Sequence, residues 1–149
     1  MPTTRTVRAA LDDLDPLVPL FDAYRQFYGQ RFDSDGARAF LTERIRRDES
    51  VIFLAVADGA VVGFTQLYPT FSSVSLERLW VLNDLFVDPA ARRTGAGRAL
   101  LTRAERWAAD TGAKGPTLST RVTNAAARRL YESCGWTRDE EFEHYHRFF

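Results

Sequence analysis

A segment rich in arginine and glycine, in the middle of the chain, has the residue types that bind phosphate. It reads Arg92-Arg93-Thr94-Gly95-Ala96-Gly97-Arg98 and follows an apolar run that ends at Val87. Glycine allows close approach of the backbone to a ligand, and the amides at a helix N-terminus favour an anion. Arginines add positive charge at the same place. The segment predicts a pyrophosphate site, and the alternative is a tight strand-to-helix turn without a ligand.

Two commoner phosphate motifs do not fit this segment. A Walker loop continues with Lys and Ser or Thr after its glycine, whereas Arg98 and Ala99 follow Gly97. A dinucleotide fingerprint needs a third glycine at position 100, which is Leu100. The remaining pattern is Arg-x-x-Gly-x-Gly.

A second motif lies about 30 residues further on and makes the first one more specific. Residues 124–136 read Asn-x(6)-Tyr-x(3)-Gly-aromatic, with Asn124, Tyr131, Gly135 and Trp136 at the fixed positions. Together the two motifs resemble the Gcn5-related N-acetyltransferase (GNAT) superfamily over about residues 80–136. Residues 24–28 and 82–87 are also similar to a dimeric branch that acetylates polyamines and histone-type lysines.

The resemblance implies acetyl-CoA as co-substrate and assigns roles to particular residues. Segment 92–98 would hold the pyrophosphate, and the backbone of residues 85–87 would pair with the pantetheine arm like an added strand. The amide of Val87 or of a neighbour would donate to the thioester oxygen, and Tyr131 would protonate the leaving thiolate. The alternatives are that Tyr131 is a packed helix residue and that Asn124 is an N-cap only. The cofactor-binding residues expected are Leu85, Phe86, Val87, Arg92, Arg93, Thr94, Gly95, Ala96, Gly97, Arg98 and Asn124.

Asp84 is the one acid inside the apolar run of residues 79–87. An alkylamine acceptor is about 99.9% protonated at neutral pH, so removing its proton costs roughly 4 kcal/mol unless the site assists. We expect Asp84 to bind the ammonium and to relay its proton through water; the alternative is a buried structural carboxylate. Tyr24, Tyr28 and Trp80 are expected to line the acceptor pocket, although aromatic residues at helical spacing also build cores.

The elements that must position these residues follow from the hydrophobic pattern. Helices are expected from Pro16 to Gly29, from Asp33 or Ser34 through Ile45, from Gly95 to near Gly112, and over 124–134. Strands are expected over 4–9, 51–57, 61–68, 79–87 and 117–122, from Trp136 onward, and over 142–149. This pattern predicts the α/β class with a mixed sheet. The resemblance implies one N-acetyltransferase domain over residues 1–149. It has a twisted sheet of six to seven strands and four helices, in the order β-α-α-β-β-β-α-β-α-β-β.

Composition excludes several classes of protein. Twenty acidic and twenty basic residues balance, which argues against nucleic-acid and membrane-surface partners. Cys134 is the only cysteine, so no intrachain disulfide forms, and no run approaches a membrane span. His144 and His146 lack a third ligand in register, so no metal is expected. The expected location is the cytoplasm.

The leading function is acetyl transfer from acetyl-CoA to a primary amine by direct attack in a ternary complex. The acceptor would be a polyamine, a diamine or a lysine side chain. Alternatives are an aminoglycoside or amino-acid N-acetyltransferase and a non-catalytic acyl-CoA-binding module. A homodimer through the C-terminal strand region is expected, because its aromatic residues would otherwise form an exposed sheet edge.

Overall fold

A five-stranded mixed sheet organises the first part of the chain. The computed structural model describes residues 4–149, which fall into two compact units, up to Ser119 and from Thr120 to Phe149. The strand order is β1-β2-β3-β4-β5, antiparallel except for the parallel pair β4 and β5. The strands are β1 Thr4–Arg8, β2 Val51–Ala57, β3 Ala60–Ser72, β4 Glu77–Val87 and β5 Gly115–Leu118. The α/β class and the mixed sheet are confirmed; a single domain stays a prediction.

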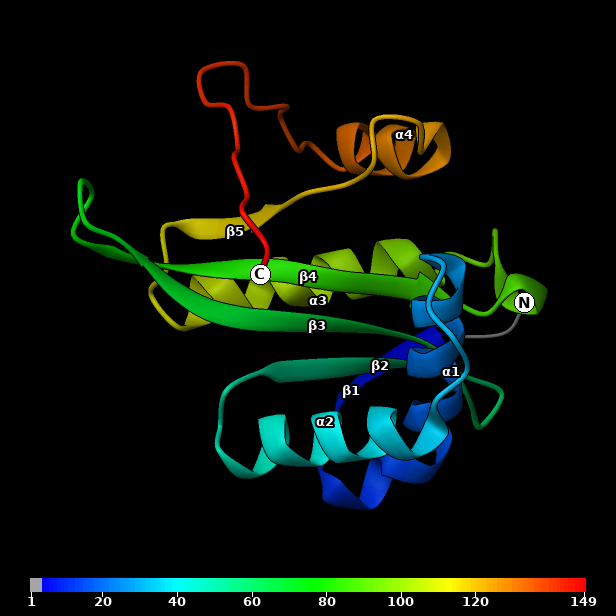
Figure 1. Ribbon diagram of the computed structural model, residues 1–149. Helices are drawn as coiled ribbons and strands as arrows, with labels where there is room; N and C mark the ends of the chain where they lie inside the picture. The colour runs from blue at the N-terminus through cyan, green and yellow to red at the C-terminus, as the bar shows by residue number, and fades with distance from the viewer. Residues whose placement is uncertain (1–3) are drawn as a thin grey trace. The chain divides into compact units, whose positions relative to one another are not determined.

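Helices cover both faces of this sheet. The α-helices of the first unit are α1 Leu14–Phe27, α2 Ser34–Arg46 and α3 Ala96–Asp110, and short 3-10 helices span Leu11–Asp13 and Pro89–Ala91. Figure 1 shows α1 and α2 on one side of the sheet and α3 on the other. Buried residues of α1 and α2 pack with Ile52, Leu54, Phe64 and Phe86 in one cluster. On the opposite face, Trp107 of α3 contacts the ring of Phe53.

Local sequence signals set several of these boundaries. Asp33 caps α2, because its carboxylate accepts the amide of Gly36 at 2.9 Å. The β2–β3 turn uses Asp58 and Gly59, both at positive φ, as the Asp-Gly pair predicts for a hairpin. β3 continues to Ser72, beyond the strand that the sequence predicts over 61–68. It continues because β4 pairs with it as far as Glu77.

Lys114 joins the β3–β4 hairpin to the segment before β5. Its backbone amide donates to the carbonyl of Arg78 at 2.8 Å, and its side chain donates to the hydroxyl of Ser75 at 2.7 Å. This lysine is the only one in the chain. Its contacts hold the turn end of the hairpin to the loop that leads into β5.

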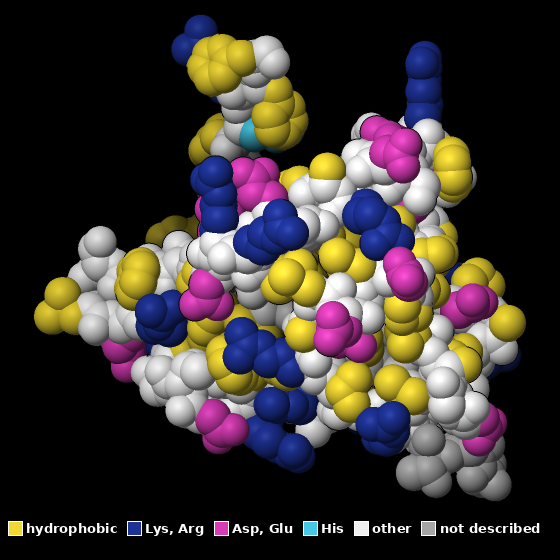
Figure 2. All heavy atoms as spheres, turned by 90° about the horizontal axis from the view of Figure 1, so that it is seen from below, with side chains coloured by type: hydrophobic (Ala, Val, Ile, Leu, Met, Phe, Trp, Pro, Cys, Tyr) yellow, Lys and Arg dark blue, Asp and Glu magenta, His cyan; other side chains and the backbone are white. Residues whose placement is uncertain are grey.

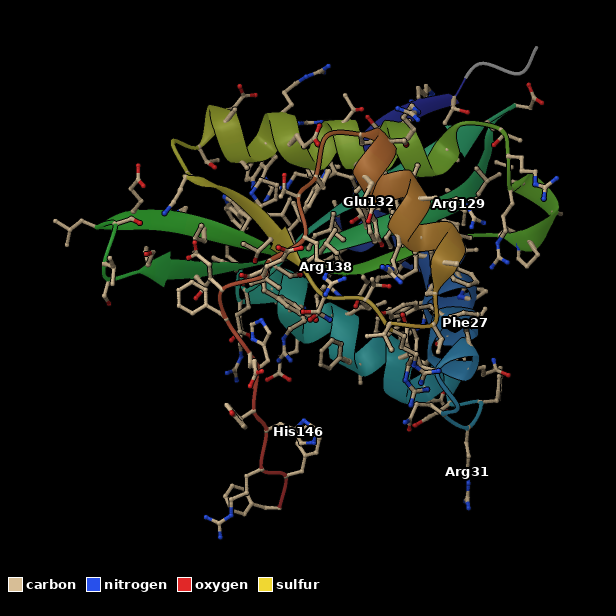
Figure 3. All side chains as sticks on the ribbon, turned by 90° about the horizontal axis from the view of Figure 1, so that it is seen from above. Phe27, Arg31, Arg129, Glu132, Arg138 and His146 are labelled. Atoms are coloured by element: carbon tan, nitrogen blue, oxygen red, sulfur yellow. The ribbon has the colours of Figure 1, made fainter. Side chains whose placement is uncertain are left out.

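The predicted sheet of six to seven strands is wrong, because the described chain has five. After α4, Ala125–Ser133, no residue of the chain up to Phe149 is in a strand. Figure 3 shows this segment as an irregular chain from Arg138 past His146. Alternation of aromatic residues specifies which side chains share a face, but a strand also needs a neighbouring edge to pair with. The strand predicted over 117–122 likewise ends at Leu118, where its pairing with β4 ends.

Gly63 gives a direct test of how closely β3 approaches β4. A Cβ at this position would lie 2.8 Å from the carbonyl oxygen of Phe86 and 3.3 Å from Cα of Val87. Because both atoms are backbone, we expect Gly63→Ala to lower the free energy of unfolding by about 1–3 kcal/mol. Gly115→Ala is the matched control, since a Cβ there would meet nothing within 4 Å. Urea denaturation measures both; an equal effect of the two variants would contradict the argument.

Candidate active site

A β-bulge in β4 determines which residues face the two layers of helices. The ladder pairs Gln66 with Asp84 and Leu67 with Leu82, so Asn83 is the extra residue. Because side chains alternate along a strand, one extra residue reverses the faces beyond it. Asp84 and Phe86 therefore lie on the α1 side of the sheet, whereas Trp80 lies on the α3 side.

Asp84 is buried but surrounded by donors. The residue is 3% exposed, and its carboxylate accepts hydrogen bonds from the side-chain amides of Gln66 and Asn83. Tyr24 of α1 places its hydroxyl beside the same group, donating to the carbonyl oxygen of Asn83 at 3.2 Å. A carboxyl held this way can accept a proton from a ligand without leaving its oxygens unpaired.

Burial also changes the acidity of these groups. Desolvation raises the pKa of Asp84 above its ordinary value, although the hydrogen bonds from Gln66, Asn83 and Tyr24 act in the opposite direction. Burial, followed by the nearby charge of Asp84, raises the pKa values of the Tyr24 and Tyr68 phenols. The tyrosines therefore stay neutral, and Asp84 becomes a stronger base than an exposed aspartate.

Asp84 opens onto a cavity of about 440 Å³ between the sheet and the helices α1 and α2. Five of its twelve lining residues are aromatic, and the rings of Tyr24 and Tyr28 meet edge to face at 5.1 Å. Tyr24 also packs against Phe64 and Phe86. The lining residues are Phe21, Tyr24, Arg25, Tyr28, Gln30, Asp33, Gly36, Ala37, Phe40, Tyr68, Asn83 and Asp84. An acid at an aromatic wall suits a ligand cation with an apolar stem.

The structure brings Tyr24, Tyr28 and Asp84 together as expected, but it places Trp80 elsewhere. The Trp80 indole donates to Thr111 at 2.9 Å, and its ring lies 5.7 Å from that of Trp107. Unbroken alternation would have put Trp80 and Asp84 on one face, and the bulge at Asn83 separates them. Trp80 is therefore a packing residue of the α3 layer.

Two polar residues of this site, Gln66 and Asn83, were not predicted from the sequence. Gln66 is fully buried, and Asn83 is the bulged residue itself. The signal for Gln66 was present, because a polar residue in the apolar strand 61–68 needs a partner as much as Asp84 does. A bulge leaves no comparable signal in one sequence.

The arginine- and glycine-rich segment forms the predicted turn into a helix. Gly95 is the N-cap of α3 with φ +87°, and a Cβ there would meet no atom within 4 Å. The first intrahelical bond runs from Ala99 to Gly95, so the amides before it lie at the open helix end. Arg92 is anchored by a bond from Nε to the carbonyl of Val87 at 3.1 Å. Arg93 and Thr94 are exposed, and Ala96 is buried.

The edge of β4 beside this turn is only partly paired with another strand. Pairing of β4 with β5 covers only Leu79 to Leu82. Residues 85–87 continue in β4 and pair with β3 at Thr65, Phe64 and Gly63. Among the strands that the structure describes, the other edge of 85–87 has no neighbour, as pairing with a pantetheine arm would require.

The second unit carries the remaining two predicted residues on α4. Asn124 is the N-cap of this helix, and its side chain accepts the amide of Ala127 at 3.2 Å. Tyr131 lies in the last turn, with its ring 6.1 Å from that of Trp136. Figure 3 shows Arg129 and Glu132 on the same helix. The capping role of Asn124 is confirmed; contacts of either residue with CoA stay a prediction.

Three further properties of the described residues concern metal sites, membrane spans and surface charge. Residues 4–149 contain no group of three His, Cys, Asp or Glu side chains placed to hold a metal ion. No helix in that range is long and apolar enough to cross a membrane. Figure 2 shows acidic and basic side chains interspersed on the face that it presents.

Comparison with known proteins gives one consistent family. Residues 17–136 match the acetyltransferase (GNAT) family. The chain is 51% identical over 138 residues, 93% of each chain, to the uncharacterized N-acetyltransferase YhfO of Bacillus subtilis (strain 168). It is 29% identical over 112 residues, 72% of this chain and 73% of the relative, to an aminoglycoside N(6')-acetyltransferase type 1 of Stenotrophomonas maltophilia.

Solved structures agree with this result. A probable acetyltransferase superposes with a TM-score of 0.92 at 46% identity, covering 97% of both chains. The aminoglycoside N-acetyltransferase AAC(6')-Iy, solved in complex with CoA, superposes with a TM-score of 0.82 at 19% identity, covering 99% of this chain and 96% of that one. The second likeness concerns the fold alone.

The raised pKa of Asp84 has a consequence for stability. The ordinary pKa of this carboxyl group is 3.8. At pH values above it, the folded state holds a proton on Asp84 more tightly than the unfolded state does. Asp84 therefore contributes more stability at low pH and loses it as the pH rises through the folded pKa. We expect the free energy of unfolding of Asp84→Asn, relative to the wild type, to increase from about pH 4 to about pH 7.

Urea denaturation across that pH range measures this difference. Asp58→Asn, which replaces an exposed carboxylate in the β2–β3 turn, controls for the general effect of pH. A difference between Asp84→Asn and wild type that stays constant with pH, or decreases, would show that burial does not dominate at Asp84.

Proposed function

Because this chain belongs to the acetyltransferase (GNAT) family and is an acyltransferase of that type, we propose that it acetylates a cationic amine held at Asp84, using acetyl-CoA. The observation that carries the proposal is the buried carboxylate of Asp84 at the wall of an aromatic cavity. An alkylammonium ion pairs with a carboxylate, and its carbon chain packs on aromatic rings. The family does not specify the acceptor, and the cavity supports a primary amine on an extended or ring-shaped cation.

The proposed reaction follows from the chemistry of an ammonium ion and a thioester. Asp84 accepts a proton from the ammonium, directly or through water, and the neutral nitrogen attacks the thioester carbonyl. The carbon–nitrogen bond forms, the carbon–sulfur bond breaks, and the thiolate leaves with the electron pair. Tyr131 is the proposed donor of a proton to that thiolate. A second proton leaves the nitrogen as the amide forms, so the products are an acetamide, free CoA and one proton.

The proposed acetyl-CoA site joins the turn into α3 with the edge of β4. The open space above Gly95 and the amides at the start of α3 suit a pyrophosphate. The edge of residues 85–87 suits the peptide-like pantetheine arm. Membership of the acetyltransferase (GNAT) family supports acetyl-CoA as the donor. We keep Asn124 as a proposed CoA contact.

A polyamine or diamine is the preferred acceptor, and an aminoglycoside is the second candidate. The acids Asp84 and Asp33 both line the cavity, which suits a molecule with more than one ammonium group. The similarity to an aminoglycoside acetyltransferase supports the second candidate. The dimeric polyamine and histone branch is not confirmed by the relatives found. A homodimer through the C-terminal region, with its exposed Phe142, Tyr145, Phe148 and Phe149, stays a proposal.

An acceptor panel tests the proposed function. Acetyl-CoA is combined with spermidine, diamines, lysine peptides and aminoglycosides while free thiol is measured. For the best acceptor, we expect Asp84→Asn to lower kcat/KM by about a hundredfold or more. CoA affinity, measured by calorimetry, should be unchanged. Tight CoA binding without turnover of any amine would instead indicate a non-catalytic acyl-CoA-binding module.

A pair of glycine variants tests the cofactor site. Gly95 and Gly112 both have positive φ, +87° and +71°, and a Cβ at either would meet nothing within 4 Å. Gly95→Ala and Gly112→Ala therefore impose similar backbone strain, at opposite ends of α3. We expect only Gly95→Ala to raise KM for acetyl-CoA, by about tenfold or more. Equal KM values in steady-state kinetics of the two variants would remove the turn from the cofactor site.

A further inference from the structure

Gln66 lies directly behind Asp84 and touches its carboxylate. It is fully buried in β3, opposite Asp84 in the ladder, and its Nε2 donates to Asp84 Oδ2. It does not line the cavity, so it does not contact a bound acceptor. Its role in the reaction, if it has one, must pass through Asp84.

The other atom of the same amide is unusual. Gln66 Oε1 is buried and has no hydrogen-bond partner within residues 4–149. A buried acceptor left without a donor costs free energy, so its retention asks for an explanation. An apolar residue of the same size would avoid that cost, but it would remove the donor to Asp84 Oδ2.

We propose that Gln66 is a positioning residue that lets Asp84 hold and release the acceptor's proton. The amide complements both states of the carboxyl group. Its N–H donates to the carboxylate that receives the ammonium, and its carbonyl oxygen can accept from the carboxylic acid formed after proton transfer. This inference rests on the proposed function of Asp84 as the proton acceptor.

Several groups around Asp84, besides Gln66, affect the pKa of its carboxyl group. Removing Gln66 takes away a hydrogen bond that lowers the pKa of Asp84, so its pKa rises further. The other titratable or charged groups that face Asp84, line its cavity or act on its neighbours are Tyr24 and Arg25 of α1, Tyr28 at the C-cap of α1, Asp33, Arg44 of α2 and Tyr68 of β3.

Thr65 offers a matched control in the same strand. It is also fully buried, and its hydroxyl donates to the backbone carbonyl of Asp84 at 2.8 Å. Thr65→Val and Gln66→Met each remove one buried hydrogen bond to Asp84 while nearly keeping the side-chain volume. Only Gln66→Met removes a hydrogen bond to the carboxylate itself, because Thr65 bonds to the backbone.

The test is the pH profile of kcat/KM with the best amine from the acceptor panel. We expect Gln66→Met to move the acid limb upward by about one pH unit, which is a tenfold loss of kcat/KM below the limb. Gln66→Glu should move it upward at least as far, because a second acid shares a proton with Asp84. Thr65→Val should lower stability and leave the limb where it is. KM for acetyl-CoA should stay constant in all three.

The outcomes separate the two proposals. If no amine is acetylated by the wild type, the proposed function fails before the role of Gln66 arises. If turnover occurs and Gln66→Met has the wild-type acid limb, or Thr65→Val shifts as far, Gln66 is structural and the inference is overturned. If Gln66→Met does not fold, the acid limb of Gln66→Glu is compared with that of the wild type, and an unshifted limb overturns the inference.

Discussion

The extra residue in β4 is the constraint on which the described site depends. Sheet pairing fixes the positions of backbone atoms, but the bulge at Asn83 decides which side chains reach which layer. Before the bulge, Trp80 packs toward α3; after it, Asp84 and Phe86 face α1. The same place ends the pairing with β5. One local irregularity thus aims the acid into a cavity and begins the stretch of open strand edge.

Burial of the Asp84 carboxylate costs desolvation free energy, and polar residues around it offset part of that cost. An acid that is 3% exposed loses most of its hydration, and the amides of Gln66 and Asn83 replace part of it. The replacement is incomplete, so the pKa of Asp84 remains raised. This balance between desolvation and hydrogen bonding makes Asp84 a stronger base than an exposed aspartate, which suits the proton acceptor that we propose.

Much of the fold followed from the sequence where local chemistry decides it. The Asp58-Gly59 hairpin, the cap at Asp33 and the glycine turn into α3 all use residues with strong intrinsic preferences. The acid at Asp84 stood out because an apolar strand surrounds it. The bulge could not be predicted, because it depends on pairing between distant strands. The C-terminal strands were overpredicted for the same reason, since alternation in 142–149 does not supply a neighbouring edge.

Lys114, which joins the β3–β4 hairpin to the loop before β5, also matters for experiments with amine-modifying reagents. A protein that modifies amines offers its own surface as a competing target, and most proteins present many lysines. Here the side chain of Lys114 is the sole lysine amine, and it is engaged with Ser75. The abundant arginines supply positive charge without a nucleophilic nitrogen at neutral pH. An acetyl donor or an amine-reactive dye therefore meets a single lysine side chain on this chain, and that lysine is exposed.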